Sequence, residues 1–118
     1  MMVDRREIAE RVQERWADFV ERGQMATFSK GQVLFYEGHL PMGAYLLWDG
    51  EIALQGGGVG DEAVVLSAKD HPVVGPDFLY SNTPFPFTAR ALSDVKIVFI
   101  ARTDFLGLLE QPVRPLHS

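Results

Sequence analysis

From Met25 onward, apolar residues alternate with polar ones in short segments, a period of two that lets a β-strand bury one face. Turn dipeptides separate these segments, among them Lys30-Gly31, Glu37-Gly38 and Asp49-Gly50. Many short strands joined by regular turns predict a closed or sandwiched antiparallel architecture. Strands are expected near 26–29, 32–36, 44–48, 51–55, 62–67, 87–93 and 95–100. Among the expected core residues are Val33, Phe35, Leu46, Ile52, Val65, Leu92, Val98 and Ile100.

A helical period precedes the strands. Asp4 and Glu7 have the spacing of a capping box, and an apolar stripe then continues to Gly23. The stripe consists of Ile8, Val12, Trp16, Phe19 and Val20. The pattern predicts one amphipathic helix over 4–22, with Trp16 as a core anchor rather than a ligand contact. Four arginines of this helix alternate with glutamates, which predicts a solvated helix face rather than a basic patch. The arginines are Arg5, Arg6, Arg11 and Arg15.

Composition excludes several classes of protein. A chain of 118 residues is expected to form one domain. The absence of cysteine rules out disulfides and thiolate metal sites and fits a reducing cytoplasm. A formal net charge of −5 argues against a nucleic-acid surface, which needs clustered Lys and Arg. Since no apolar run is long enough to span a membrane and the N-terminus is too charged for a signal peptide, a cytoplasmic protein is expected.

Motifs for catalysis and metal binding are missing. The sequence contains no G-x-S-x-G, no H-E-x-x-H and no cysteine nucleophile, so an enzyme is not expected. His39, His71 and His117 are scattered and do not form the H-x-H…E pattern of a metal-binding cupin, so neither a metal site nor a cofactor is expected. The glycine-rich stretch 56–60 is expected to be a loop without a phosphate role, because no helix follows it.

Two longer motifs carry a family resemblance. The first is K-G-Q-V-L-F-Y-E-G at 30–38, followed by Tyr45-Leu46-Leu47-x-x-Gly50-x-Ile52. The second is G-P-D-F-L-Y-S-N-T-P-F-P-F-T-A-R-A at 75–91. Both resemble the cyclic-nucleotide-binding domain family, which includes the sensor domains of Crp/Fnr-type regulators. The resemblance implies a mainly β fold, a jelly-roll-like antiparallel β-roll (double-stranded β-helix) with flanking α-helices.

The resemblance also implies the organisation of the chain, all of it as one domain. An N-terminal amphipathic helix is expected in 1–24, the β-roll in 25–101, and a C-terminal helix and tail in 102–118. The C-terminal helix is expected over 102–111, ending before Pro112. In Crp/Fnr-type regulators a long lid helix and a DNA-binding winged helix follow. These 118 residues contain neither, so they are not expected to read DNA by themselves; whether they are a natural chain or part of a longer regulator stays open.

In the family, the second motif is the cassette that binds the cyclic phosphate. Its glutamate accepts the ribose hydroxyl and its arginine pairs with the phosphate, but here these positions hold Pro76 and Phe85. Phe87 also replaces a small residue that lets the backbone approach the phosphate. The positions that keep the family residue are Gly75, Leu79, Thr83, Pro84, Thr88 and Ala91. The candidate ligand-binding residues of this degenerate cassette are Gly75, Pro76, Asp77, Phe78, Leu79, Phe85, Pro86, Phe87 and Thr88.

Three features of the cassette leave alternatives open. Asp77 could replace the lost glutamate after a shift of one residue, although an exposed turn aspartate is favoured. Arg90 is expected on the face of its strand opposite to Phe87, in solvent. The aromatic residues Phe78, Tyr80, Phe85 and Phe87 either fill the vacated pocket, which we favour, or line a pocket for an apolar ligand.

The sequence therefore predicts a non-enzymatic regulatory or sensor module that does not bind cAMP or cGMP. The alternative is the effector-binding domain of a Crp/Fnr-type transcriptional regulator that senses a different small molecule. The expected partners are a second copy, forming a homodimer, or a larger regulatory protein, with no nucleic acid or membrane. The homodimer is expected because Phe105, Leu109 and the tail at Pro112 should expose apolar surface in the absence of a lid helix.

Overall fold

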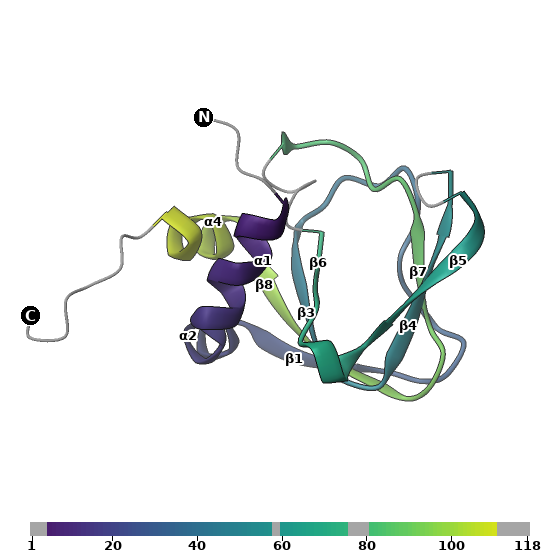
Figure 1. The fold of residues 1–118 in the computed structure, drawn as a ribbon, viewed down its shortest axis with the longest axis horizontal. Helices are drawn as coiled ribbons and strands as arrows, with labels where there is room; N and C mark the ends of the chain where they lie inside the picture. The colour runs from purple at the N-terminus through teal and green to yellow at the C-terminus, as the bar shows by residue number, and fades with distance from the viewer. Residues whose placement is uncertain (1–4, 58–59, 76–80, 111–118) are drawn as a thin grey trace, which may run out of the picture.

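The computed structural model describes residues 5–57, 60–75 and 81–110. Within them, eight strands form two antiparallel sheets of four strands each, which face one another (Figure 1). The first sheet has the order β1 (Gln24–Phe28), β8 (Val95–Ala101), β3 (Gly43–Asp49) and β6 (Val73–Val74). The second sheet has the order β2 (Val33–Phe35), β7 (Thr88–Ala91), β4 (Glu51–Gly56) and β5 (Gly60–Ser67). The predicted mainly β, antiparallel roll is confirmed.

The α-helices gather on the outer face of the first sheet, away from the second (Figure 1). They are α1 (Arg5–Glu14), α2 (Trp16–Arg22) and α4 (Arg102–Glu110), and a 3-10 turn, η1 (Ala68–Asp70), follows β5. The prediction of one helix over 4–22 is wrong, because the helix breaks at Arg15, whose φ is −120° and ψ 32°. The break directs α2 toward α4 and β8, so that Phe19 packs on Phe105 with ring centroids 5.3 Å apart.

Alternation along β3 and β8 divides the apolar side chains between two cores. Ala44 and Leu46 face the helices, whereas Tyr45 and Leu47 face the second sheet. We call the first group the helix-side core: Ile8, Val12, Phe19, Ala44, Leu46, Val98, Ile100, Phe105, Leu108 and Leu109. We call the group between the sheets the roll core: Phe35, Leu47, Ile52, Leu54, Val74, Phe85, Phe87, Ala89, Ala91, Val95 and Ile97.

Most of the expected core residues are buried, but two predictions are wrong. The buried ones are Phe35, Leu46, Ile52, Val98 and Ile100, and Val33 is partly buried. Val65 is 53% exposed, because it pairs with Ala53 on the outer face of the second sheet, which none of the described helices covers. Leu92 is 40% exposed, because it lies just after the end of β7, where the chain turns toward β8.

Two arginines of the N-terminal helical segment, Arg11 in α1 and Arg15 at the break, bond to another helix. Arg11 Nη1 donates to the carbonyl oxygen of Leu109 at 3.1 Å, and Arg15 Nη1 donates to that of Leu108 at 3.0 Å. These carbonyls belong to the last turn of α4, where helical partners are missing and positive charge is favourable. Arg11 is exposed and paired with Glu7, as expected of a solvated face. Arg11 and Arg15 in addition fasten the N-terminal helical segment to the end of α4.

Two smaller features differ from the expectation. Trp16 is only partly buried at the rim of the helix-side core, where its indole meets the ring of His71 edge-on at 5.1 Å between centroids. Strand β6 was not predicted, because two residues are too few to show an alternation. It matters for function, because β6 leads directly into Gly75, the first residue of the cassette.

Candidate ligand-binding site

The structure describes two parts of the cassette, Gly75 and residues 81–91. The predictions made for Pro76, Asp77, Phe78, Leu79 and Tyr80 lie outside the described residues. Gly75 follows β6 with φ +93°, a conformation that favours glycine, and it is buried. At the other end, β7 carries the chain back into the second sheet. The cassette therefore begins on one sheet of the roll and returns on the other.

The side chain of Phe85 lies inside the roll. It is 3% exposed and stacks face to face on Phe35 of β2, with ring centroids 3.8 Å apart and planes inclined by 17°. The start of the cassette lies against the same ring, because a Cβ atom added to Gly75 would lie 3.1 Å from Cε1 of Phe85. The ring thus fills the space between the first glycine of the cassette and the opposite sheet.

The backbone around Phe85 is committed to the loop between β2 and β3. The Phe85 N–H donates to the His39 carbonyl oxygen at 2.9 Å, and the Gly38 N–H donates to the Phe85 carbonyl oxygen at 2.8 Å. Further along, Thr88 Oγ1 accepts a hydrogen bond of 3.0 Å from the Glu37 N–H. Pro86, between them, has no N–H to donate. At positions 85 and 86 there is consequently no free backbone donor for a ligand phosphate.

Other rings of the roll extend the stack. Phe87 is buried and lies 5.9 Å from Phe35, between ring centroids. Tyr45 lies 5.2 Å from Phe35 and 5.3 Å from Phe99, so the row crosses to the first sheet. Burial raises the pKa of the Tyr45 hydroxyl above its ordinary value, as expected for a phenol in apolar surroundings. The rings that sequence analysis singled out within the described residues, Phe85 and Phe87, are both core side chains.

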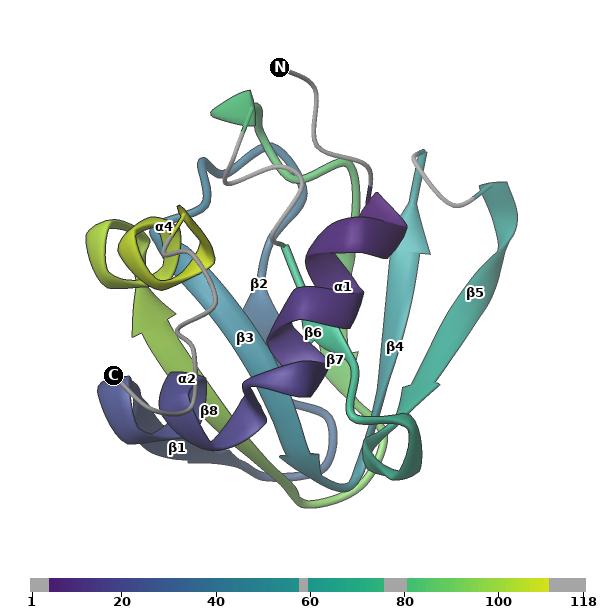
Figure 2. The same ribbon diagram turned by 60° about the vertical axis from the view of Figure 1, so that its left-hand side comes forward.

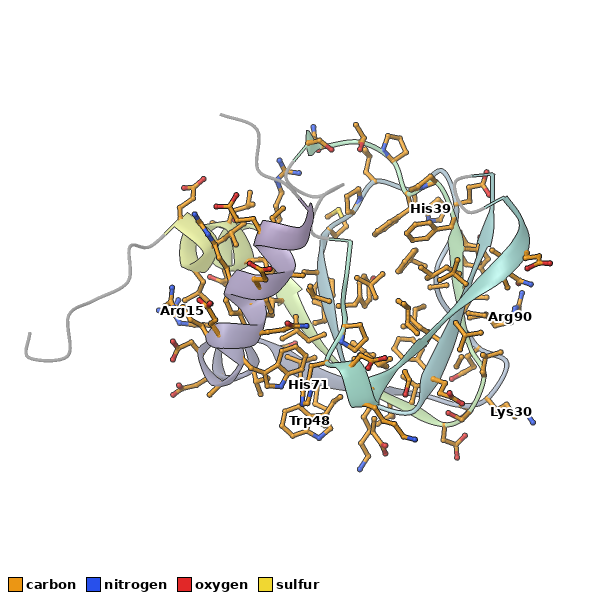
Figure 3. All side chains as sticks on the ribbon, in the orientation of Figure 1. Arg15, Lys30, His39, Trp48, His71 and Arg90 are labelled. Carbon is orange, nitrogen blue, oxygen red and sulfur yellow. The ribbon has the colours of Figure 1, made fainter. Side chains whose placement is uncertain are left out.

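Within the described part of the roll, no buried cation is present to meet a phosphate. Among the described residues, no polar or charged side chain is buried. Arg90 is exposed on the outer face of β7, as predicted, and its Nη1 donates to the Gly31 carbonyl oxygen at 2.8 Å (Figure 3). Its neighbour Ala89 is buried on the inner face. Arg90 is the arginine closest in sequence to Phe85, which occupies the position of the family's arginine, and it secures a surface turn.

Sequence analysis missed a different arginine that contacts the cassette. Arg102, the first residue of α4, donates from Nη1 to Asn82 Oδ1 at 2.9 Å, and its backbone N–H donates to the Met42 carbonyl oxygen at 3.0 Å. Asn82 adopts a left-handed backbone conformation with φ +57°. Because these two residues are 20 positions apart, only the folded topology brings them together. Arg102 couples the start of α4 to the cassette from outside the roll core.

The described residues lack two other kinds of feature. Nowhere in 5–57, 60–75 and 81–110 do three or more metal-ligating side chains come together. In the same part of the chain, no helix is both long and apolar enough to cross a membrane.

Comparison with known proteins agrees with the fold. The model of the cyclic nucleotide-binding domain family matches residues 25–112, more than half of the chain. A structure from a cyclic-GMP-dependent signalling pathway that regulates bacterial phytopathogenesis superposes with a TM-score of 0.71 and 24% identity, covering 82% of this chain and 77% of that one. The catabolite activator protein of Thermus thermophilus has a TM-score of 0.69 and 22% identity, covering 81% and 46%.

A third structure is the N-terminal domain of a transcriptional regulator from Streptomyces coelicolor A3(2), with a TM-score of 0.66 and 24% identity, covering 81% of this chain and 67% of that one. At these identities the structures establish a shared fold. The chain spans just under half, 46%, of the length of the Thermus protein.

Proposed function

We propose a function for this chain on the basis of its membership of the cyclic nucleotide-binding domain family, to which it belongs. It is a non-enzymatic regulatory domain whose roll binds neither cAMP nor cGMP. The observation that carries the proposal is the position of Phe85, buried between Phe35 and Gly75. In the family pattern, the residue at this position pairs with the cyclic phosphate. Here an apolar ring fills the space instead, and the domain acts through protein contacts.

The electrostatics support the same proposal. A cyclic phosphate carries a negative charge, and burying a charge without a partner costs several kcal/mol. No described lysine or arginine is buried, the Phe85 N–H is already bonded to His39, and Pro86 has no N–H. With the loss of the ribose acceptor at Pro76, a nucleotide would gain few of the polar contacts that offset its desolvation.

The alternative, a receptor for a different effector, would need space within the roll. The described rings that would line its pocket are in contact with one another, Phe85 with Phe35 at 3.8 Å and Phe87 with Phe35 at 5.9 Å between centroids. Aromatic pairs such as the stacked Phe85–Phe35 and the tilted Phe87–Phe35 stabilise a core beyond the burial of their area. The filled roll therefore favours regulation by protein contacts over small-molecule sensing.

A thermal-shift screen tests the proposed function, since a ligand of the native state raises the melting temperature by mass action. For cAMP and cGMP at 1 mM, a Kd of about 1 mM or weaker stabilises by no more than about 0.4 kcal/mol, which is a shift of roughly 2 °C. We expect no larger shift with either nucleotide. A Kd of about 10 µM would give about 2.7 kcal/mol and roughly 10 °C, and would contradict the proposal. A comparable shift with another small molecule would instead favour the receptor.

A further inference from the structure

Strand β5 is a long edge of the second sheet. It is the last strand in the order β2-β7-β4-β5 and runs from Gly60 to Ser67 (Figure 2). Two of its central side chains are exposed, Val64 to 42% and Val65 to 53%. Among the described residues, its only strand partner is β4. With respect to the described residues, the edge therefore presents unpaired backbone groups beside exposed β-branched side chains.

Natural proteins protect such edges with short strands, prolines, lysines or bulges. The other edge strands are short, with five residues in β1, three in β2 and two in β6. Strand β5 has eight residues and contains neither proline nor lysine. Its pairing with β4 is irregular between Gly60 and Val64 and regular from Val64 to Ser67. Glu62, near its start, is the charged side chain seen exposed on it. An edge of this length and composition is suited to pairing with another strand.

We propose that β5 pairs antiparallel with β5 of a second copy of the chain, which joins the two outer sheets into one. A two-fold axis perpendicular to the sheet keeps the faces aligned, so each residue must oppose a residue on the same face. Val65 points outward and Val64 and Leu66 point inward, given their pairing with Ala53, Leu54 and Ile52. The register that centres the apolar segment places Val65 opposite its own counterpart and Val64 opposite Leu66 of the partner.

The strand is complementary to itself in this register. One Val–Val and two Val–Leu pairs form the centre, and such cross-strand pairs stabilise sheets. Toward the ends, Ala63 lies opposite Ser67 of the second copy, and Glu62 comes near its 3-10 turn η1, which carries Lys69 and Asp70. The apolar centre, which is complementary to itself, selects a second copy as the occupant of the edge.

The surface that we propose for the homodimer differs from the one that the sequence suggested. Phe105 and Leu109 are buried in the helix-side core, so the premise of an exposed apolar surface is wrong for these two residues. The tail at Pro112, which belonged to the same premise, lies outside the described residues. The exposed valines of β5 replace it. A single strand pair buries less than the roughly 1,200 Å² of a stable interface, so we expect a weak dimer, with a Kd of roughly tens to hundreds of micromolar.

Single-cysteine variants test the register, because the chain has no cysteine of its own. Directly opposed residues have Cβ atoms about 4.5–5.5 Å apart, close to what a disulfide needs. Under mild oxidation at about 0.1 mM protein, Val65→Cys is expected to cross-link at least tenfold faster than Leu92→Cys, an exposed control away from the edge. Each variant is first checked for native folding by circular dichroism.

Sedimentation equilibrium of the unmodified chain provides the second measurement. We expect a concentration-dependent monomer–dimer equilibrium that Val65→Lys abolishes, because it places two like charges face to face, and that Leu92→Lys leaves intact. Equal cross-linking of the two cysteine variants, a dimer that survives Val65→Lys, or a monomer at about 1 mM would each overturn the proposal. In the last case the edge would be open to an extended segment of another protein.

Discussion

Replacing Phe85 with alanine is expected to destabilise the domain by about 3–5 kcal/mol, the usual cost of truncating a buried phenylalanine. The ring is 3% exposed and stacks on Phe35, and its edge lies against the Gly75 backbone. Its removal would leave a cavity between two sheets whose backbones are fixed by hydrogen bonding, so little collapse can compensate. Since domains of this size are stable by only about 5–15 kcal/mol, the loss should be large in a urea or guanidinium titration.

Tyr36→Ala is the matched control. Tyr36 is also aromatic and follows Phe35 directly, but it is 54% exposed, with its ring tilted against His39. Its truncation is expected to cost less than about 1 kcal/mol. If Phe85→Ala prevents folding, the smaller change Phe85→Leu should still give a measurable loss. Equal and small effects of Phe85→Ala and Tyr36→Ala would show that Phe85 does not support the roll.

Restoring the two family residues with Pro76→Glu and Phe85→Arg is expected to create affinity for cyclic nucleotides. A hydrogen bond to a charged group contributes about 1.5–3 kcal/mol, and each 1.4 kcal/mol is tenfold in Kd. Two such contacts should therefore tighten binding by at least about a hundredfold. The arginine also replaces a buried ring, so the variant should be less stable than the natural sequence and should regain stability when cAMP or cGMP is added.

The control for this variant separates the site from the net charge. Pro76→Glu combined with Leu92→Arg makes the same change in charge, but places the arginine at an exposed position outside the roll. Because it keeps the restored ribose acceptor but lacks the arginine in the roll, it is expected to bind at least about tenfold more weakly than the double variant. A double variant that folds without gaining affinity would place the obstacle at Pro86 and Phe87, and the two lost charge contacts would not be the main cause.

The alternation of apolar residues was sufficient to predict the roll and most of its core. Along β3, Leu46 and Leu47 are both buried, on opposite faces, because the first sheet has the helices on one side and the second sheet on the other. The same reasoning failed for Val65, since alternation identifies the two faces of a strand but cannot tell whether a further layer covers the outer one. An edge strand is recognised only once the strand order is known.

Contacts between distant parts of the chain account for the remaining differences. The hydrogen bonds from Arg11 and Arg15 to the end of α4, and from Arg102 to Asn82, depend on how the helices pack on the roll. At the candidate site, the family pattern identified Phe85 as the residue in the arginine position. It did not predict the stacking on Phe35, because that contact joins β2 to the cassette across the roll. Local pattern thus identified the residues, and topology determined their contacts.

Isothermal titration calorimetry of the natural chain with cAMP and with cGMP is the most direct test of the central claim, that Phe85 fills the space a cyclic phosphate would need. We expect no saturable heat below about 1 mM nucleotide, which corresponds to no more than about 4 kcal/mol of binding free energy. Saturable binding of either nucleotide with a Kd in the micromolar range would contradict the claim, because the ring of Phe85 would then have to leave the roll core to admit the ligand.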